Sequence, residues 1–387
     1  MKDLTGNPAI FGGVSVIFAG DFHQLMPCNG KPLYKSKCVE VKAINNIMFL
    51  HMSHRFDKDP EYGSLLRRFC YGRASKNDIQ KINTRFIGND DVHLPNNPSC
   101  IRYACATNKE RNAISSKVFL QHLQQTHSTN KHETCHPHTV IIKGSMTTRK
   151  RRISRSLRNT IYDTCGDSNV KDPHDKKIDP ALKFFYNVPL MLNNNDCIDE
   201  KLGNGTPCHG LYLVLKDGAT MEKENWNGYY VNTIEACYIK YIVCSKKSQS
   251  EEGPHQYFYV EPQQISIHIS IPSLSTLSIR GIKMEQLPMN DNIATTGHKL
   301  QGATLTNLIV KSWDYKVTNW IYVVLSRVKQ LTGLVLCQPL DENRNYTCDP
   351  ELTRFEKRMK HYHEIQLFKR RDEMREYEDY ESKYNNI

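Results

Sequence analysis

An acid and an amide follow an apolar run near the start of the chain. Residues 14–19 (VSVIFA) are apolar and β-branched, a pattern typical of a strand buried on both faces. Asp21 and Gln24 follow at once, at the end of that strand where ligand sites of open α/β sheets lie. A carboxylate and an amide there can contact a metal-bound water and a terminal phosphate. In the alternative interpretation, Asp21 and Gln24 only cap backbone groups of an ordinary turn.

A single arginine interrupts an apolar run near the end of the chain. Arg327 lies within residues 322–328 (YVVLSRV). A fixed cation on such an element can stabilise the charge of a transferring phosphoryl group, an effect worth about 10³–10⁵ in rate. A structural ion pair is the alternative. Just upstream, residues 295–302 (TTGHKLQG) offer hydroxyl, imidazole, ammonium and amide groups before a strand pattern at 305–310.

The elements that must position these side chains alternate between strand and helix patterns. The sequence predicts strands at 14–19, 47–52, 100–106 and 305–310, and helices at 61–71, 78–86 and 109–124. Such alternation indicates an α/β fold with a parallel sheet. Short β-type runs at 211–215, 229–244 and 256–260 predict a small inserted barrel, whereas the polar, basic stretch 125–180 lacks periodicity and is expected to be a loosely ordered insertion.

Length and composition limit the class of protein. At about 150 residues per domain, 387 residues suggest two or three domains, and 39% hydrophobic residues exclude wholesale disorder. The net charge of +11 favours a polyanionic partner such as nucleic acid. The 13 cysteines include no C-x-x-C pair, which excludes a zinc ribbon and a thioredoxin-type motif. Their odd number and scattered positions favour reduced thiols in an intracellular protein. With no run of about 18 apolar residues and no leader pattern at the start, neither a membrane span nor secretion is expected.

Five segments, in this order, resemble the Pif-one-like DNA helicases (the petite-integration-frequency family of superfamily 1), including the forms carried by Helitron-type transposons. They are FGGVSVIFAGDFHQLMP at 11–27, SHRFDKDPEYGSLLRRF at 53–69, ATNKERNAISSKVF at 106–119, PLMLNNNDCIDEKLGNGT at 189–206, and ATTGHKLQGATL with WIYVVLSRVKQLTGLVL within 294–336. The first looks like helicase motif III, the second like motif IV, and the last pair like motifs V and VI.

The resemblance implies a RecA-like (P-loop NTPase type) α/β core with a parallel sheet and an inserted SH3-like β-barrel, plus part of a first RecA-like domain. The expected domains are the remnant of the first RecA-like domain at 1–46, the second RecA-like domain at 47–124, 181–207 and 289–340, the basic insertion at 125–180, the barrel at 208–288 and a charged helical tail at 341–387.

The resemblance also implies roles for single residues. Gln24 looks like the sensor of the γ-phosphate, with Asp21 supporting its loop, and Arg55 and Arg327 look like the two arginines that reach a nucleotide. The residues that look like parts of the single-stranded DNA track are Thr107, Asn108, Thr296, His298, Lys299 and Gln301. A translocase binds DNA without reading its sequence, so polar contacts to phosphates and some base stacking suffice. For His298, a buried structural histidine is the alternative.

The sequence departs from the family in two ways. Met26 stands where the family usually has a second proline, which is expected to loosen the sensor loop. The Walker A pattern G-x-x-x-x-G-K-[ST] is missing, and so is the Asp-Glu pair for Mg²⁺ that should precede motif III. The chain is therefore interpreted as the C-terminal portion of a helicase: a truncated gene model, a split gene or a decayed transposon copy, whose N-terminal half would act in cis or in trans.

The family implies ATP and Mg²⁺ as cofactors, 5′→3′ movement on single-stranded DNA, and forked or structured DNA as further partners. It also implies roles in DNA repair, recombination or telomere maintenance, in the nucleus or in mitochondria. The alternatives are a non-catalytic nucleic-acid-binding remnant and an RNA-directed member of the superfamily. A metal site at His132, Cys135, His136 and His138, and a DNA contact or nuclear-localisation patch at 149–152 with Arg155 and Arg158, are weaker candidates.

Overall fold

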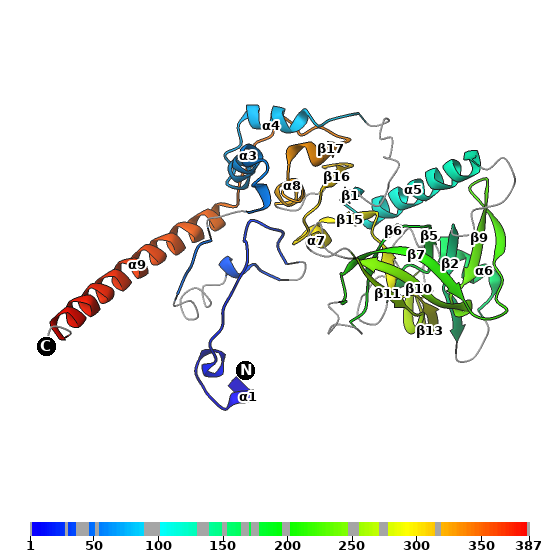
Figure 1. Ribbon diagram of the computed structural model, residues 1–387, viewed down its shortest axis with the longest axis horizontal. Coiled ribbons are helices and arrows are strands. Elements are labelled where there is room, and N and C mark those ends of the chain that lie inside the picture. The colour runs from blue at the N-terminus through cyan, green and yellow to red at the C-terminus, as the bar shows by residue number, and fades with distance from the viewer. Residues whose placement is uncertain are drawn as a thin grey trace. The chain divides into compact units, whose positions relative to one another are not determined.

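The computed structural model describes residues 2–27, 30–35, 46–50, 54–88, 101–129, 139–148, 153–163, 170–171, 178–195, 202–246, 255–270, 278–313 and 319–384 (Figure 1). The chain forms two compact units. Unit 1 consists of Met1–Arg85, Lys316–Thr332 and Pro339–Ile387, and unit 2 of Phe86–Tyr315 and Gly333–Gln338. These boundaries differ from the domain boundaries expected above.

A parallel four-stranded sheet in unit 2 confirms the α/β class. Its strands are β1 (Ile101–Cys105), β15 (Ala294–Thr296), β16 (Asn307–Val310) and β17 (Leu334–Leu336), in the order β15-β1-β16-β17, and all neighbours are parallel. The helix α5 (Asn108–Thr129) follows β1 directly, and α7 (Gly297–Leu300) follows β15. The strands predicted at 100–106 and 305–310 and the helix predicted at 109–124 therefore exist.

Unit 2 also contains three further sheets, antiparallel throughout except that β2 and β9 pair in parallel. One has five strands in the order β11-β10-β7-β6-β14, and two have four, in the orders β3-β13-β12-β4 and β5-β2-β9-β8. Their strands are β2 (Val140–Lys143), β3 (Ser145–Thr148), β4 (Val170–Lys171), β5 (Ala181–Phe184), β6 (Val188–Leu192), β7 (Pro207–Leu215), β8 (Glu222–Trp226), β9 (Tyr229–Glu235), β10 (Ile239–Lys246), β11 (Gln256–Val260), β12 (Gln263–Ser270), β13 (Ser278–Gln286) and β14 (Met289–Asp291).

One hydrophobic core joins these sheets to the parallel sheet. Tyr103 and Ile309 from the parallel sheet belong to the same buried cluster as Phe119 of α5 and Phe184 and Ile242 of the antiparallel strands. Burial of side chains from so many elements fixes the start of α5 and the end of β15 relative to the antiparallel sheets within unit 2.

The structure differs from the expectation of a loosely ordered insertion over 125–180. Within its described residues, β2 pairs with β5 and β9, β3 pairs with β13, and α6 (Arg155–Asp163) packs on the sheet. Val140, Ile142 and Ile161 are fully buried. The apolar runs here are only about four residues long, too short for periodicity to reveal them in a polar stretch. The barrel expected over 208–288 stays a prediction, because the sheets also take strands from outside that range.

Unit 1 is mainly helical. It contains α1 (Lys2–Thr5), α3 (Pro60–Cys70), α4 (Lys76–Asn83), α8 (Trp320–Leu325) and α9 (Pro350–Tyr384), with short 3₁₀ turns at Ile10–Gly13, Leu33–Lys35 and His54–Phe56. Two helices begin at good N-caps: Asp59 accepts the Tyr62 N–H, and Ser75 forms a capping box with Asp78. The predicted helices 61–71 and 78–86 correspond to α3 and α4.

The predicted buried strand at 14–19 is wrong. Residues 14–19 run without helix or strand, and Ile17 is 93% exposed. Residues 46–50, within the predicted strand 47–52, also form no strand, while 51–52 lie outside the described residues. An apolar β-branched run becomes a strand only where another strand satisfies its backbone groups, and no described strand pairs with either segment.

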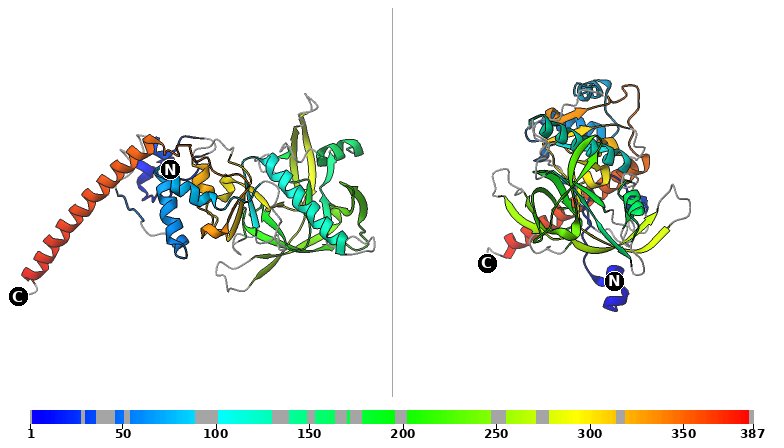
Figure 2. Two further views of the ribbon diagram at one scale, coloured as in Figure 1. Left: turned by 90° about the horizontal axis from the view of Figure 1, so that it is seen from above. Right: turned by 90° about the vertical axis from the view of Figure 1, so that its right-hand side faces the viewer.

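The charged tail forms one long helix, α9 (Figure 2). Apolar residues near its start are buried. Leu352, Phe355 and Met359 are buried in a cluster with Tyr34, and Met26 packs against that cluster. The tail is therefore not purely an exposed element. Met26, expected to loosen its loop, instead contributes side-chain packing.

Candidate functional site

The loop after residues 14–19 is organised by Asp21. The Asp21 Oδ1 accepts the backbone N–H of His23 at 2.9 Å, and its Oδ2 accepts the Gln24 Nε2 at 3.4 Å. The Gln24 N–H also donates to the Asp21 carbonyl at 3.2 Å. Asp21 thus caps a tight turn, as the alternative interpretation expected, and the same bonds orient the Gln24 amide.

His23, between these two residues, is buried and tied to the C-terminal helix. Its Nε2 lies 2.7 Å from Glu356 Oε1, its Nδ1 lies 3.8 Å from the Cys348 sulfur, and its ring packs edge-on against Tyr71 at 4.9 Å. No local pattern could reveal the role of His23, because its polar partners Glu356 and Cys348 lie more than 300 residues away in the chain. They hold the Asp21 turn in one orientation.

Arg327 is almost completely buried at the end of α8. Its Nε donates to the Val323 carbonyl at 2.7 Å and its Nη2 to the Ser326 hydroxyl at 2.6 Å. Burial, with a smaller contribution from the nearby Arg55, lowers the pKa of Arg327 to about 10, although Tyr322 and Asp21 act in the opposite direction. Because burial disfavours the charge of Arg327, an anion that approaches the guanidinium would stabilise it.

Arg55 reaches the same end of α8. Its Nη1 donates to the Ser326 carbonyl at 2.8 Å, next to the Leu325 carbonyl, which accepts the Tyr62 hydroxyl at 2.8 Å. Burial lowers the pKa of Arg55. Arg55 comes from a 3₁₀ turn that precedes α3 and Arg327 comes from α8, so two distant segments place two guanidinium groups within electrostatic range of each other.

The Gln24 loop joins this group directly. The Asn319 side chain donates to the Gln24 carbonyl at 3.2 Å, and Asn319, in the left-handed region at φ 68°, directly precedes α8. The structure therefore brings together all four residues expected at the nucleotide: Asp21, Gln24, Arg55 and Arg327 lie around α8 in unit 1. Two arginines against one carboxylate leave an excess of positive charge, which suits a phosphate group.

The residues expected to contact nucleic acid lie in unit 2, where two parallel strands end. Cys105 of β1 is in register with Thr296 of β15, so both strands deliver their following residues to one edge of the sheet. Thr107 is exposed, and its hydroxyl accepts the Glu110 N–H at 3.2 Å at the start of α5. Glu110 in turn accepts the Ala106 N–H at 2.8 Å. These bonds fix the entry to α5.

Thr296 is half-buried at the N-cap position of α7, where its side chain makes no capping bond. Lys299 is exposed, and its Nζ lies 3.8 Å from the Met191 sulfur. Partial desolvation and the nearby Arg111 lower the pKa of Lys299, whereas Asp291 opposes them. Gln301 is half-buried just after α7. For Asn108 and His298 the backbone is described at the starts of α5 and α7, and their side chains are not.

Two residues beside this edge were missed by the sequence analysis. Arg111 lies one turn into α5, where its guanidinium donates to Asn112 Oδ1 at 3.0 and 3.2 Å. Asp291 is buried and accepts the Ser115 hydroxyl at 2.7 Å, and burial raises its pKa. Arg111 lies within the motif at 106–119, four residues after Thr107. A cation one helical turn from an expected DNA contact was the feature that could have identified it.

The weaker candidates gain no structural support. The His/Cys segment at 132–138 and the basic run at 149–152 lie outside the described residues. Among the described residues, no group of three or more His, Cys, Asp or Glu side chains could hold a metal ion, and no helix is long and apolar enough to cross a membrane. Arg158 pairs with Glu235 at 3.0 Å, as a structural ion pair would.

The sequence matches no protein-family model, and no curated protein matches it. Similar solved structures include the Pif1 helicase from Candida albicans, at a TM-score of 0.61 and 16% identity over 92% of this chain and 72% of that chain. Pif1 from Bacteroides bound to single-stranded DNA gives 0.58 and 15% over 92% and 69%. The same protein in complex with ADP-AlF3 and single-stranded DNA gives 0.58 and 16% over 93% and 70%. The chain therefore has the RecA-like fold of the Pif1 helicases.

Proposed function

We propose that this chain supplies the arginine side of the nucleotide site and the single-stranded DNA track of an ATP-dependent 5′→3′ DNA helicase. The observation that carries the proposal is the meeting of Asp21, Gln24, Arg55 and Arg327 around α8. Gln24 would sense the terminal phosphate, and the two arginines would stabilise the charge that develops on it. The similar structures are of a Pif1 helicase, in one case bound to both ADP-AlF3 and single-stranded DNA, which supports this assignment.

ATP and Mg²⁺ need more than this group of residues. The arginines and Gln24 fit a phosphate, but the described residues hold no carboxylate cluster for a metal ion, and the sequence contains no P-loop. Those elements would come from another polypeptide segment, in cis or in trans. When bound, Mg²⁺ would neutralise part of the phosphate charge.

For the track, we propose that Thr107, Asn108, Thr296, His298, Lys299 and Gln301 contact the phosphates of single-stranded or forked DNA. The parallel register of β1 and β15 supports this, because it delivers both segments to one sheet edge. Roles in repair, recombination or telomere maintenance, nuclear or mitochondrial location and transposon origin are proposed from the family resemblance alone.

Equilibrium binding to a fluorescein-labelled oligothymidine, measured by anisotropy over a salt series, tests the track. We expect binding that weakens steeply with salt, and for Lys299→Gln a log–log slope smaller in magnitude by about 0.7, the effect of one lost phosphate contact on a single strand. Lys223→Gln on β8 is the matched control and should keep the slope. Equal slopes for the two variants would remove Lys299 from the track, and absence of binding by the whole chain would refute the DNA-binding function.

A non-catalytic nucleic-acid-binding remnant is the second candidate, favoured by the missing P-loop pattern. A separate alternative is an RNA-directed protein. The same binding assay, with oligouridine in place of oligothymidine, separates it from a DNA-directed one.

A further inference from the structure

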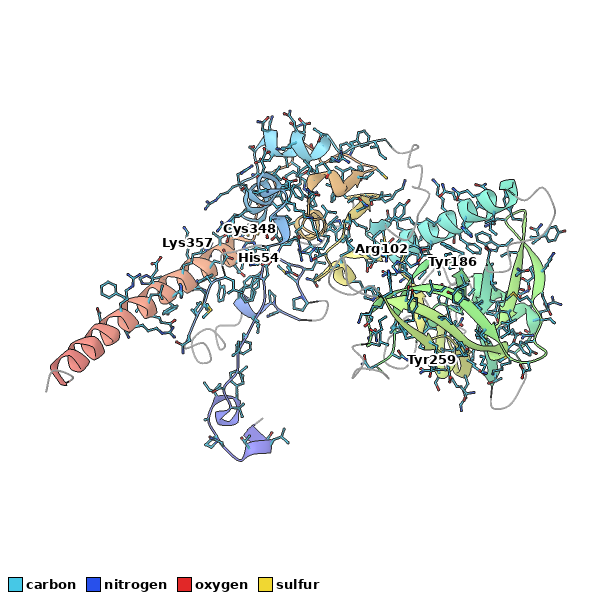
Figure 3. All side chains as sticks on the ribbon, viewed as in Figure 1. His54, Arg102, Tyr186, Tyr259, Cys348 and Lys357 are labelled. Atoms are coloured by element: carbon cyan, nitrogen blue, oxygen red, sulfur yellow. The ribbon has the colours of Figure 1, made fainter. Side chains whose placement is uncertain are left out.

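Exposed tyrosines gather on one sheet of unit 2, and the functions proposed above do not use them. The exposed fractions are 66% for Tyr257, 69% for Tyr259, 44% for Tyr212 and 55% for Tyr186 (Figure 3 labels Tyr186 and Tyr259). Tyr257 and Tyr259 lie on β11 and Tyr212 on β7, while Tyr186 lies in the turn between β5 and β6. A cluster of large exposed aromatic rings on one sheet is typical of an interaction surface, because soluble proteins rarely expose contiguous apolar patches.

Strand register places these rings on the same face. Val243 of β10 is opposite both Tyr259 of β11 and Tyr212 of β7, so the three form one row across the sheet. Neighbouring positions point to the other face, where Cys244 is fully buried in the core. The tyrosines therefore form an outer face, which we call the tyrosine face and define as Tyr186, Tyr212, Tyr241, Tyr257 and Tyr259.

The tyrosine rings lie beside one another in pairs, and each pair leaves ring surface exposed to solvent. Tyr186 and Tyr212 are stacked at 6.4 Å between ring centroids with an angle of 30°, and Tyr241 and Tyr259 lie 5.5 Å apart and are tilted by 48°. Aromatic rings held by a rigid sheet lose little conformational entropy when a planar group stacks on them.

The tyrosine face leads to the proposed DNA track. In the row of Tyr257, Ser245 and His209, the next residue is Pro189 of β6, and Met191 lies two residues further along the same face of β6. The Lys299 ammonium rests on that face, 3.8 Å from the Met191 sulfur. This sheet face thus carries the contact with Lys299 at β6, whose own residues are buried, exposed rings at β7 and β11, and the half-exposed ring of Tyr241 at β10.

Charge on the face suits a polyanion. None of the outward positions of β6, β7, β10 and β11 given by the described register is Asp or Glu, and the Lys240 ammonium lies 6.0 Å from the Tyr241 ring centroid. Stacking rings beside cations is the arrangement that binds single strands without sequence preference, because every base offers a π-face.

We propose that the tyrosine face is a base-stacking platform for the single-stranded nucleic acid that leaves the track at Lys299. The proposal rests on the proposed track, and it adds a second binding surface of different chemistry: aromatic rings for bases where the track offers polar groups for phosphates.

The test compares the whole chain with the double variant Tyr212→Ala/Tyr259→Ala, using an oligothymidine long enough to cover both surfaces. Stacking on one ring strengthens binding by about fivefold or more, so the loss of two rings should weaken binding by at least about 25-fold. Its salt dependence should stay unchanged, because no phosphate contact is lost. Tyr212→Phe/Tyr259→Phe keeps the rings and should bind like the unmodified chain. Tyr230→Ala, at an exposed position of β9 in another sheet, is the matched control.

Three outcomes would overturn the proposal. If the alanine double variant binds within twofold of the Tyr230→Ala control while Lys299→Gln alters the salt slope, the track stands and the platform is wrong. If the unmodified chain binds no single strand, both fail. If light scattering shows a dimer that the double variant converts to a monomer with unchanged DNA affinity, the face joins two copies of the chain instead.

Discussion

Arg55 and Arg327 come from distant segments and meet at the end of α8. Because both guanidinium groups are partly removed from water, their charges are costly there, and an anion would stabilise them. Arg55 and Arg327 both donate to groups of the last turn of α8 or of Ser326, and each disfavours the charge of the other. An approaching phosphate relieves that repulsion. The resemblance to helicase motifs predicted these two residues and Asp21 and Gln24. It could not predict the role of His23, whose hydrogen-bond partner Glu356 lies on a helix at the far end of the chain.

Asp78 provides a prediction about pH. Its carboxylate accepts the Arg68 Nε at 3.0 Å and the Ser75 N–H at 2.9 Å, and the bond to Arg68 lowers its pKa to about 2 from an ordinary value of 3.8. The bonded form is the charged one, so its stabilising effect is present above pH 3.8 and is lost as the pH falls towards 2.

We expect Asp78→Asn to lower the free energy of unfolding by about 1–2 kcal/mol at neutral pH, with the difference from the unmodified protein closing between pH 4 and 2. Urea unfolding at several pH values measures it. Asp57→Asn, at a side chain that is 66% exposed, is the control and should change little. A difference that persists at pH 2 would show that the charge of Asp78 is not the cause.

At the scale of elements, the sequence predicted helices and strands best where the pattern of apolar residues was long and needed no distant partner. The helices α3, α4 and α5 and the strands β1 and β16 match predicted positions within a few residues. The strand predicted at residues 14–19 is wrong because a strand forms only beside a pairing partner, which no local pattern reveals. The strands β2 and β3 were missed because each is four residues long and lies in a polar stretch.

The C-terminal helix is predicted to stabilise the segment that carries motif III. Phe355 of α9 is 4% exposed, and its ring lies 5.3 Å from Phe22 and 6.2 Å from Tyr34. Phe355→Ala should lower the free energy of unfolding by about 3–5 kcal/mol through the cavity it leaves, as measured by urea denaturation. Phe368→Ala, on the same helix and 67% exposed, should have little effect. Equal effects of the two changes would mean that α9 does not pack on this segment.

At the scale of the whole molecule, the missing P-loop decides what the chain can do alone. We expect the purified chain to bind single-stranded DNA and to show no DNA-stimulated ATP hydrolysis, because its sequence contains no P-loop lysine and no Asp-Glu pair ahead of residues 11–27 to hold Mg²⁺. A phosphate-release assay with and without oligothymidine measures this, and robust stimulated hydrolysis would contradict it.

Photo-crosslinking maps the DNA path most directly. Oligothymidine with scattered 5-iododeoxyuridine is bound to the whole chain and irradiated, and the crosslinked peptides are identified by mass spectrometry. The account predicts adducts in the peptides that contain residues 106–111 and 296–301, from the edge where β1 and β15 end, and, from the base-stacking platform, in those that contain Tyr212 and Tyr259. Adducts confined to other peptides, such as those of β8 and α9, would contradict it.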